Sequence, residues 1–78
     1  MSKTVTYQAH TIKSCPSLLL GSGKWKIIIS IFWEAKGAVT MRPFSAENSY
    51  DTEAEADLHG ITFGQRIIDG KVPGLSVN

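Results

Sequence analysis

The sequence predicts an α+β domain in which a three-stranded antiparallel β-meander is followed by one C-terminal α-helix packed on one face of the sheet. Three observations favour this order of β-β-β-α. The run 25–33 alternates around an apolar stripe, the segment 34–38 contains a glycine turn signal, and a capping motif begins a helix near residue 52. The 78 residues form a single predicted domain, 1–78, close to the lower limit for independent folding.

The first strand is expected over about residues 4–12, which are rich in β-branched side chains. Val5, Tyr7 and Ala9 share one face of this strand. A loop over 13–24 follows, because Pro16 and the Gly21–Gly23 segment interrupt regular structure. Two alternatives remain for the leucines at 18–20: they fold over one end of the core, or they extend the first strand.

The second strand is expected over 25–34 and has large apolar residues on both faces. Side chains alternate along a strand, so one face is a continuous core stripe and the other mixes charged, hydroxyl and apolar groups. The core stripe is Trp25, Ile27, Ile29, Ile31 and Trp33, and the mixed face is Lys26, Ile28, Ser30, Phe32 and Glu34.

The third strand is expected over 38–45, after a hairpin loop containing Gly37. A three-residue loop aligns the core stripes of the two strands and pairs Ile28 with Phe44, whereas a two-residue loop would exchange the faces. The hydrophobic match favours the three-residue loop. Pro43 lacks a backbone donor and predicts that this strand lies at an edge of the sheet.

The helix is expected over 53–69, followed by a C-terminal tail over 71–78. Thr52 and Glu55 have capping-box spacing, and the acidic residues that follow favour the positive end of the helix dipole. Gly60 and Gly64 lie on or beside the apolar side of the helical wheel. Their spacing indicates a close approach of helix to sheet, or alternatively a helix contact between subunits.

Charge and cysteine content limit the functional classes. Residues 1–46 contain six Lys or Arg and one acid, and residues 47–78 contain two bases and six acids, so the net charge of +1 does not describe a generally basic nucleic-acid binder. Cys15 is the one cysteine, which favours a reducing compartment. Residues 1–12 lack the apolar segment of a signal peptide, and no apolar run is long enough to cross a bilayer. We expect a cytoplasmic protein without membrane contact.

No pattern in the chain has the spacing of a catalytic, metal or cofactor site. The Gly21–Lys24 segment lacks the longer glycine loop and following helix of a phosphate-binding motif. Cys15, His10 and His59 share no metal-ligand spacing, and the acids over 47–57 lack the ligand loop of a calcium motif. We therefore expect no enzyme activity, no metal and no cofactor.

The face of the sheet that the helix leaves uncovered is the predicted interaction surface. Its expected members combine apolar and basic side chains: Lys26, Ile28, Phe32, Arg42 and Phe44. A monomer of this size rarely leaves such a patch exposed, so either the tail over 72–77 or a second molecule is expected to cover it. We favour a partner surface, with self-association as its simplest form. The alternative use of this basic and aromatic face is nucleic-acid binding.

One family resemblance spans about residues 5–74. It is carried by Tyr7 and Ile12, the Trp25–Ile29 run, the 51–56 segment and the 67–70 segment Ile-Ile-Asp-Gly. In this order the chain resembles small bacterial domains that include the HlyU-like family. The resemblance implies a bacterial protein with a three-stranded meander and a C-terminal helix, and part of that group is described as transcriptional activators. It supplies no catalytic residues.

These observations lead to one functional expectation and one alternative. We expect a small non-catalytic protein-interaction or regulatory module, with an unknown protein partner or a homodimer. The alternative is a nucleic-acid-binding accessory protein or a transcription-related protein.

Overall fold

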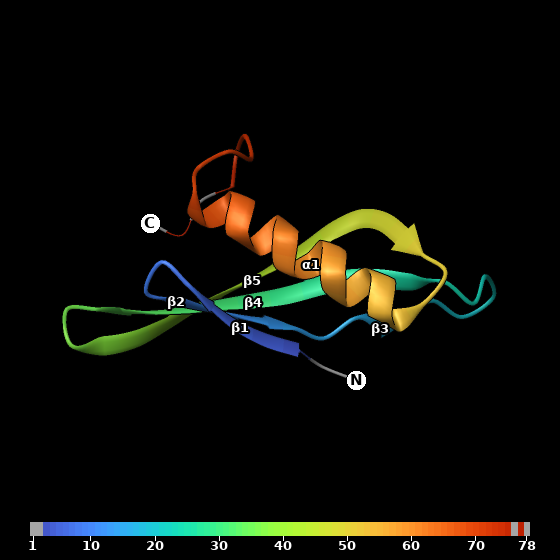
Figure 1. Ribbon diagram of the computed structural model, residues 1–78, viewed down its shortest axis with the longest axis horizontal. Helices are drawn as coiled ribbons and strands as arrows, with labels where there is room; N and C mark the ends of the chain where they lie inside the picture. Colours follow the sequence, from blue (N-terminus) through green and yellow to red (C-terminus); the bar gives the residue numbers. More distant parts are fainter. Residues whose placement is uncertain (1–2, 76, 78) are drawn as a thin grey trace.

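The chain folds as an α+β domain with an antiparallel sheet of five strands and one C-terminal helix (Figure 1). The computed structural model describes residues 3–75 and 77, so residues 1, 2, 76 and 78 of the predicted domain lie outside it. The α+β class and the antiparallel sheet are confirmed, but the expected number of three strands is wrong. The elements are β1 (Lys3–Tyr7), β2 (His10–Ser14), β3 (Ser17–Leu18), β4 (Trp25–Ala35), β5 (Ala38–Tyr50) and α1 (Glu53–Ile68).

The expected first strand over 4–12 is in fact a hairpin of β1 and β2. Gln8 and Ala9 form its two-residue turn with φ angles of 50° and 64°, and Tyr7 pairs with His10. Two positive φ values are the signature of a type I′ turn, which matches the twist of the strands. The turn was not predicted because neither residue is glycine or asparagine, the residues that usually adopt positive φ angles.

The strand β4 is the centre of the sheet. β2 and then β3 pair along one side of it, and β5 pairs along the other. The leucines at 18–20 neither extend the first strand nor fold over the core. Leu18 lies in a separate strand, β3, opposite Trp25, and Leu20 is 92% exposed.

The hairpin between β4 and β5 has a two-residue turn, so the predicted three-residue loop is wrong. Lys36 and Gly37 have φ angles of 53° and 80°, again the type I′ geometry. Ala35 consequently pairs with Ala38, and Phe44 pairs with Ile29 instead of Ile28. The three-residue loop was favoured because it aligned two apolar stripes. In the observed register that alignment is lost, and Phe44 is buried instead, at 7% exposed.

β5 is an edge strand, as Pro43 predicted, and it is longer than expected. Between the pairs Ile28–Ser45 and Lys26–Ser49, β5 contains two more residues than β4. This irregularity bends β5, whose far end curves toward the start of α1 (Figure 1).

The helix begins at the predicted capping box. Thr52 is extended, its hydroxyl oxygen accepts a hydrogen bond from the Glu55 backbone N–H at 3.1 Å, and the hydroxyl donates to Glu55 Oε1 at 3.1 Å. The helix ends at Ile68, with Asp69 as the C-cap and Gly70 at a φ of 74°. Gly70 therefore ends the helix as predicted.

The helix packs closely on one face of the sheet through its two glycines. A Cβ atom at Gly64 would lie 2.8 Å from Ile12 Cγ2, and one at Gly60 would lie 3.0 Å from the Ser14 hydroxyl oxygen. The predicted close approach of helix to sheet is thus confirmed. The core between them consists of Ile12, Ile27, Ile29, Ile31, Phe44, Ile61, Ile67 and Val77.

The C-terminal tail lies on the helix side of the sheet. Val77 is buried within the core cluster, and Val72 and Leu75 pack against the same cluster. Of the two covers expected for the other face, the described part of the tail is therefore excluded.

Candidate interaction surface

The sheet face opposite the helix is not covered by any described element, and we refer to it as the open face. Strand alternation and register place three groups of side chains on it. They are Lys26, Ile28, Ser30, Phe32 and Glu34 from β4; Val39, Met41, Pro43 and Ser45 from β5; and Thr11, Lys13 and Cys15 in and beside β2.

Apolar side chains occupy the half of the open face formed by β4 and β5. Phe32 lies opposite Met41, and Ile28 lies two residues along the same face of β4. Phe32 and Ile28 are half-buried, whereas Met41 is 49% and Val39 74% exposed. Exposed apolar groups that cluster in this way are typical of an interaction surface.

A shallow groove of ≈ 320 Å³ crosses this half of the open face. It is lined by Lys26, Ile28, Pro43, Phe44 and Ser45. Its β5 residues, 43–45, lie directly before the irregular pairing of that strand.

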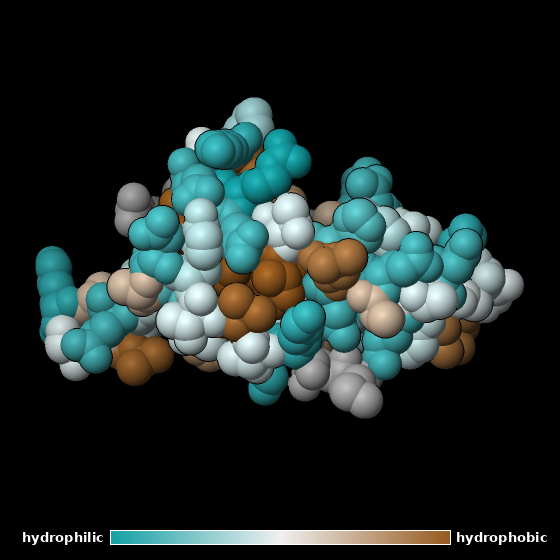
Figure 2. All heavy atoms as spheres, in the orientation of Figure 1, coloured by the Kyte–Doolittle hydropathy of each residue, from teal (hydrophilic) through white to brown (hydrophobic). Residues whose placement is uncertain are grey.

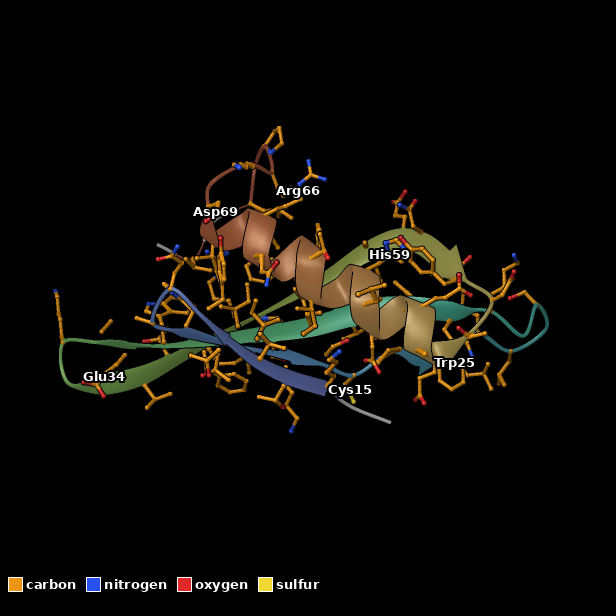
Figure 3. The ribbon with its side chains drawn as sticks, viewed as in Figure 1. Cys15, Trp25, Glu34, His59, Arg66 and Asp69 are labelled. Carbon is orange, nitrogen blue, oxygen red and sulfur yellow. The ribbon has the colours of Figure 1, made fainter. Side chains whose placement is uncertain are left out.

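The charged residues of β4 on this face lie at its two ends. Glu34 is near the β4–β5 turn, and Trp25, the neighbour of Lys26, is near the opposite end (Figure 3). The eight residue steps from Lys26 to Glu34 span about 26 Å of extended strand. Lys24 forms an ion pair with Asp51 instead, because its ammonium group lies 3.0 Å from an Asp51 carboxylate oxygen. Along β4 and β5 the open face therefore has Lys26 at one end, Glu34 at the other and apolar side chains between them, while Lys13 on β2 is level with Ser30 in the middle.

Three of the five predicted surface residues lie together on this face, and two do not. Lys26, Ile28 and Phe32 are on the open face as expected. Placing Arg42 and Phe44 there was wrong, because the two-residue turn exchanges the faces of β5: Phe44 is buried opposite Ile29, and the Arg42 guanidinium lies 5.6 Å from the Phe44 ring centroid.

Met41, Val39, Pro43 and Cys15 also lie on this face, although they were not predicted to do so. The first three follow from the two-residue turn at Lys36 and Gly37, whose type I′ geometry sets the register of β5. Cys15 follows from the pairing of β2 with β4, since its N–H donates to the Ile28 carbonyl at 2.9 Å.

The cysteine and the histidines are not brought together. Cys15 and His59 lie on opposite sides of the sheet (Figure 3). The His59 ring stacks on Tyr50 with centroids 4.4 Å apart, and His10 lies 5.8 Å from Trp33. Within residues 3–75 and 77, no group of three or more His, Cys, Asp or Glu side chains is arranged to hold a metal ion.

A second groove lies between α1 and β5. Its volume is ≈ 200 Å³, and it is lined by Ile27, Ala46, Asn48, Tyr50, His59, Thr62, Phe63 and Arg66. Small-molecule sites usually measure about 300–1,000 Å³ and enclose most of the ligand. This groove is smaller than that range.

The helix side of the molecule has apolar surface between α1 and β1 (Figure 2). Val5 of β1 and Ile68 of α1 are partly buried and pack against the core cluster, so apolar surface on this side belongs to the edge of the core. Leu58 is the strongly exposed apolar residue of the helix, at 59%.

Two polar contacts tie the helix to the sheet. The Tyr7 hydroxyl donates to both carboxylate oxygens of Asp69, at 2.8 and 3.0 Å, and this hydrogen bond raises the pKa of Tyr7 above its usual value. Ser14 donates to Asp57 Oδ1 at 2.8 Å, and both residues are buried. These contacts fix the position of α1 and leave the open face free.

The fold and the surface together define a small α+β domain with an open antiparallel sheet. No family model matches the chain, and comparison with curated proteins and with solved structures gives no match. In the described part of the chain, no helix is both long and apolar enough to span a bilayer.

Proposed function

We propose that this chain is a non-catalytic protein-interaction module that binds its partner through the open face. The observation that carries the proposal is the cluster of Ile28, Phe32 and Met41, which neither the helix nor the described part of the tail covers. Burying such a cluster against a partner removes apolar surface from water, at roughly 25 cal/mol per Å².

The dimensions of the domain support this proposal. Its accessible surface is 5033 Å², whereas a compact monomer of 8.5 kDa exposes about 4,700 Å². The principal extents are 43 × 25 × 16 Å, and Figure 1, viewed along the shortest of them, shows the helix stacked on one side of the sheet and no described element on the other.

Nucleic-acid binding receives less support from the same face. Arg42 and Phe44, two of the residues on which that alternative depended, belong to the other side of the sheet. Lys13 and Lys26 remain on the open face, and the negative charge of Glu34 on the same face offsets part of their positive charge. Phosphate contacts require several unopposed cations.

Phe32→Asp is expected to abolish partner binding while leaving the fold intact, because it places a charge in the middle of the apolar cluster. The matched control is Leu58→Asp, which makes the same kind of change at an exposed helix position on the other side. Both variants are immobilised, and the proteins retained from an extract of the source cells are compared, with and without nuclease. Circular dichroism checks that both variants are folded.

The proposal requires a protein that the wild type and Leu58→Asp retain, that Phe32→Asp loses, and that nuclease does not release. Equal retention by Phe32→Asp would contradict it. Release of every bound protein by nuclease would favour the nucleic-acid alternative instead.

A further inference from the structure

We infer that the partner is a second copy of this chain, packed face to face on the open face about a two-fold axis that runs across the strands beside Ser30. This inference rests on the proposed function, because it uses the same surface and specifies its occupant. The observation behind it is the order of side chains along β4.

The open-face residues of β4, taken in order along the strand, are complementary in charge and in apolar character to the same residues taken in the opposite direction. They read Lys26, Ile28, Ser30, Phe32 and Glu34. When a second copy is stacked in the opposite direction about Ser30, each Lys26 faces the Glu34 of the second copy. Each Ile28 then faces a Phe32, and the two Ser30 side chains meet at the centre. A two-fold contact of this kind uses the same patch on both subunits.

The neighbouring strand β5 fits the same axis. Met41 is level with Phe32, Pro43 with Ser30, and Ser45 with Ile28. The axis therefore stacks each Met41 on the small Ser45 of the second copy, and Pro43 on Pro43. Side chains of stacked sheets interdigitate across about 10 Å, so a large residue above a small one is favourable.

The other in-plane axis is unfavourable. A two-fold axis along the strands would place Lys26 against Lys26 and Glu34 against Glu34, which are like charges. In the favoured arrangement Lys13, which is level with Ser30 on β2, faces its own copy. Its side chain must then extend past β1 so that the two ammonium groups reach water.

The area of the open face fits a small dimer interface. Figure 1 is viewed down the shortest axis and shows the helix stacked on the sheet, so the open face extends along the 43 Å and 16 Å extents and measures on the order of 700 Å². Specific interfaces begin at about 600 Å² on each partner. The dimer therefore uses the width of the face from β2 to β5 and lies at the small end of the standard size.

The test is a set of charge reversals measured by sedimentation equilibrium. Lys26→Glu and Glu34→Lys are each expected to raise the dissociation constant of the dimer by about tenfold or more, because two attractive pairs become repulsive. The double variant restores opposite charges at both contacts and is expected to return to within about threefold of the wild type. Lys71→Glu, in the tail on the helix side, is the matched control and leaves the constant unchanged. High salt should reduce these differences, since it screens exposed charges.

A mixture of the two single variants gives a further check. One copy then has two acids and the other two bases, so a heterodimer forms more tightly than either variant alone. The inference requires this result together with rescue by the double variant.

Three outcomes would overturn the inference. A wild type that remains monomeric at the highest attainable concentration, while Phe32→Asp still abolishes capture of another protein, rejects the second copy and retains the proposed function. A dimer that Phe32→Asp splits but neither charge reversal weakens rejects the axis and also retains the proposed function. A dimer that is insensitive to Phe32→Asp rejects both.

Discussion

Gly64→Leu is expected to destabilise the domain by about 3 kcal/mol or more and to lower its Tm by about 15 °C or more. The glycine lies where the helix meets the sheet, and even a Cβ atom there would lie 2.8 Å from Ile12 Cγ2 and 3.2 Å from Ile29 Cδ1. Both isoleucines are fully buried, so neither can move aside. The helix must therefore move away from the sheet. The packing free energy lost in this way exceeds the gain of about 1 kcal/mol in helix propensity from replacing glycine.

Thr62→Leu is the control for this variant, because Thr62 is exposed on the same helix. Thermal unfolding followed by circular dichroism is the measurement. If Gly64→Leu unfolds at the same temperature as the parent protein, the helix does not approach the sheet at this position.

Ser14→Ala and Asp57→Ala are expected to give the next largest losses, about 2 kcal/mol each. The Ser14 hydroxyl has no exposed surface, and Asp57 is 9% exposed, so removing either residue leaves a buried polar group without its partner. Removing both is expected to cost less than the sum of the two, because no orphaned group then remains.

Denaturant unfolding of the two single variants and the double variant measures this coupling, expected at about 1–2 kcal/mol. Asp51→Ala serves as a control: its side chain is 78% exposed, and its pairing with Lys24 is worth less than about 1 kcal/mol. Additive losses in the double variant would contradict a direct interaction between Ser14 and Asp57.

The parts of the fold that the sequence predicted correctly have strong local signals. The start of α1 follows from the Thr52–Glu55 capping box, and its end follows from Gly70. β4 follows from the alternation of its isoleucines. In each case the local pattern and the tertiary packing require the same structure.

The errors arose at turns whose residues gave a weak or ambiguous signal. Gln8 and Ala9 adopt positive φ angles that few sequences would suggest, so the β1–β2 hairpin was read as one strand. At the second hairpin, Gly37 was assigned to a longer loop because that register aligned two apolar stripes. A shift of one residue exchanged every side chain of β5 between faces, and Arg42 and Phe44 left the predicted surface.

The buried Ser14–Asp57 contact was missed for a different reason. Asp57 was grouped with the exposed acids at the start of the helix, although on a helical wheel it lies close to Gly64. That position is a signal that Asp57 faces the sheet. Its partner Ser14 lies in a segment that was expected to be a loop, and a loop position does not predict a contact with the helix.

The central claim is that the open face is where the chain meets its partner, and the reactivity of Cys15 tests it most directly. Cys15 is the one cysteine of the chain, it is exposed, and it lies on the open face beside Ile28. The rate at which a small alkylating reagent modifies its thiol is measured in dilute protein and under conditions in which the chain is bound to its partner. We expect modification to slow severalfold on binding in the wild type and in Leu58→Asp, and to stay fast throughout in Phe32→Asp. Equal rates in free and bound wild-type protein would contradict the claim, because the partner would then occupy another surface.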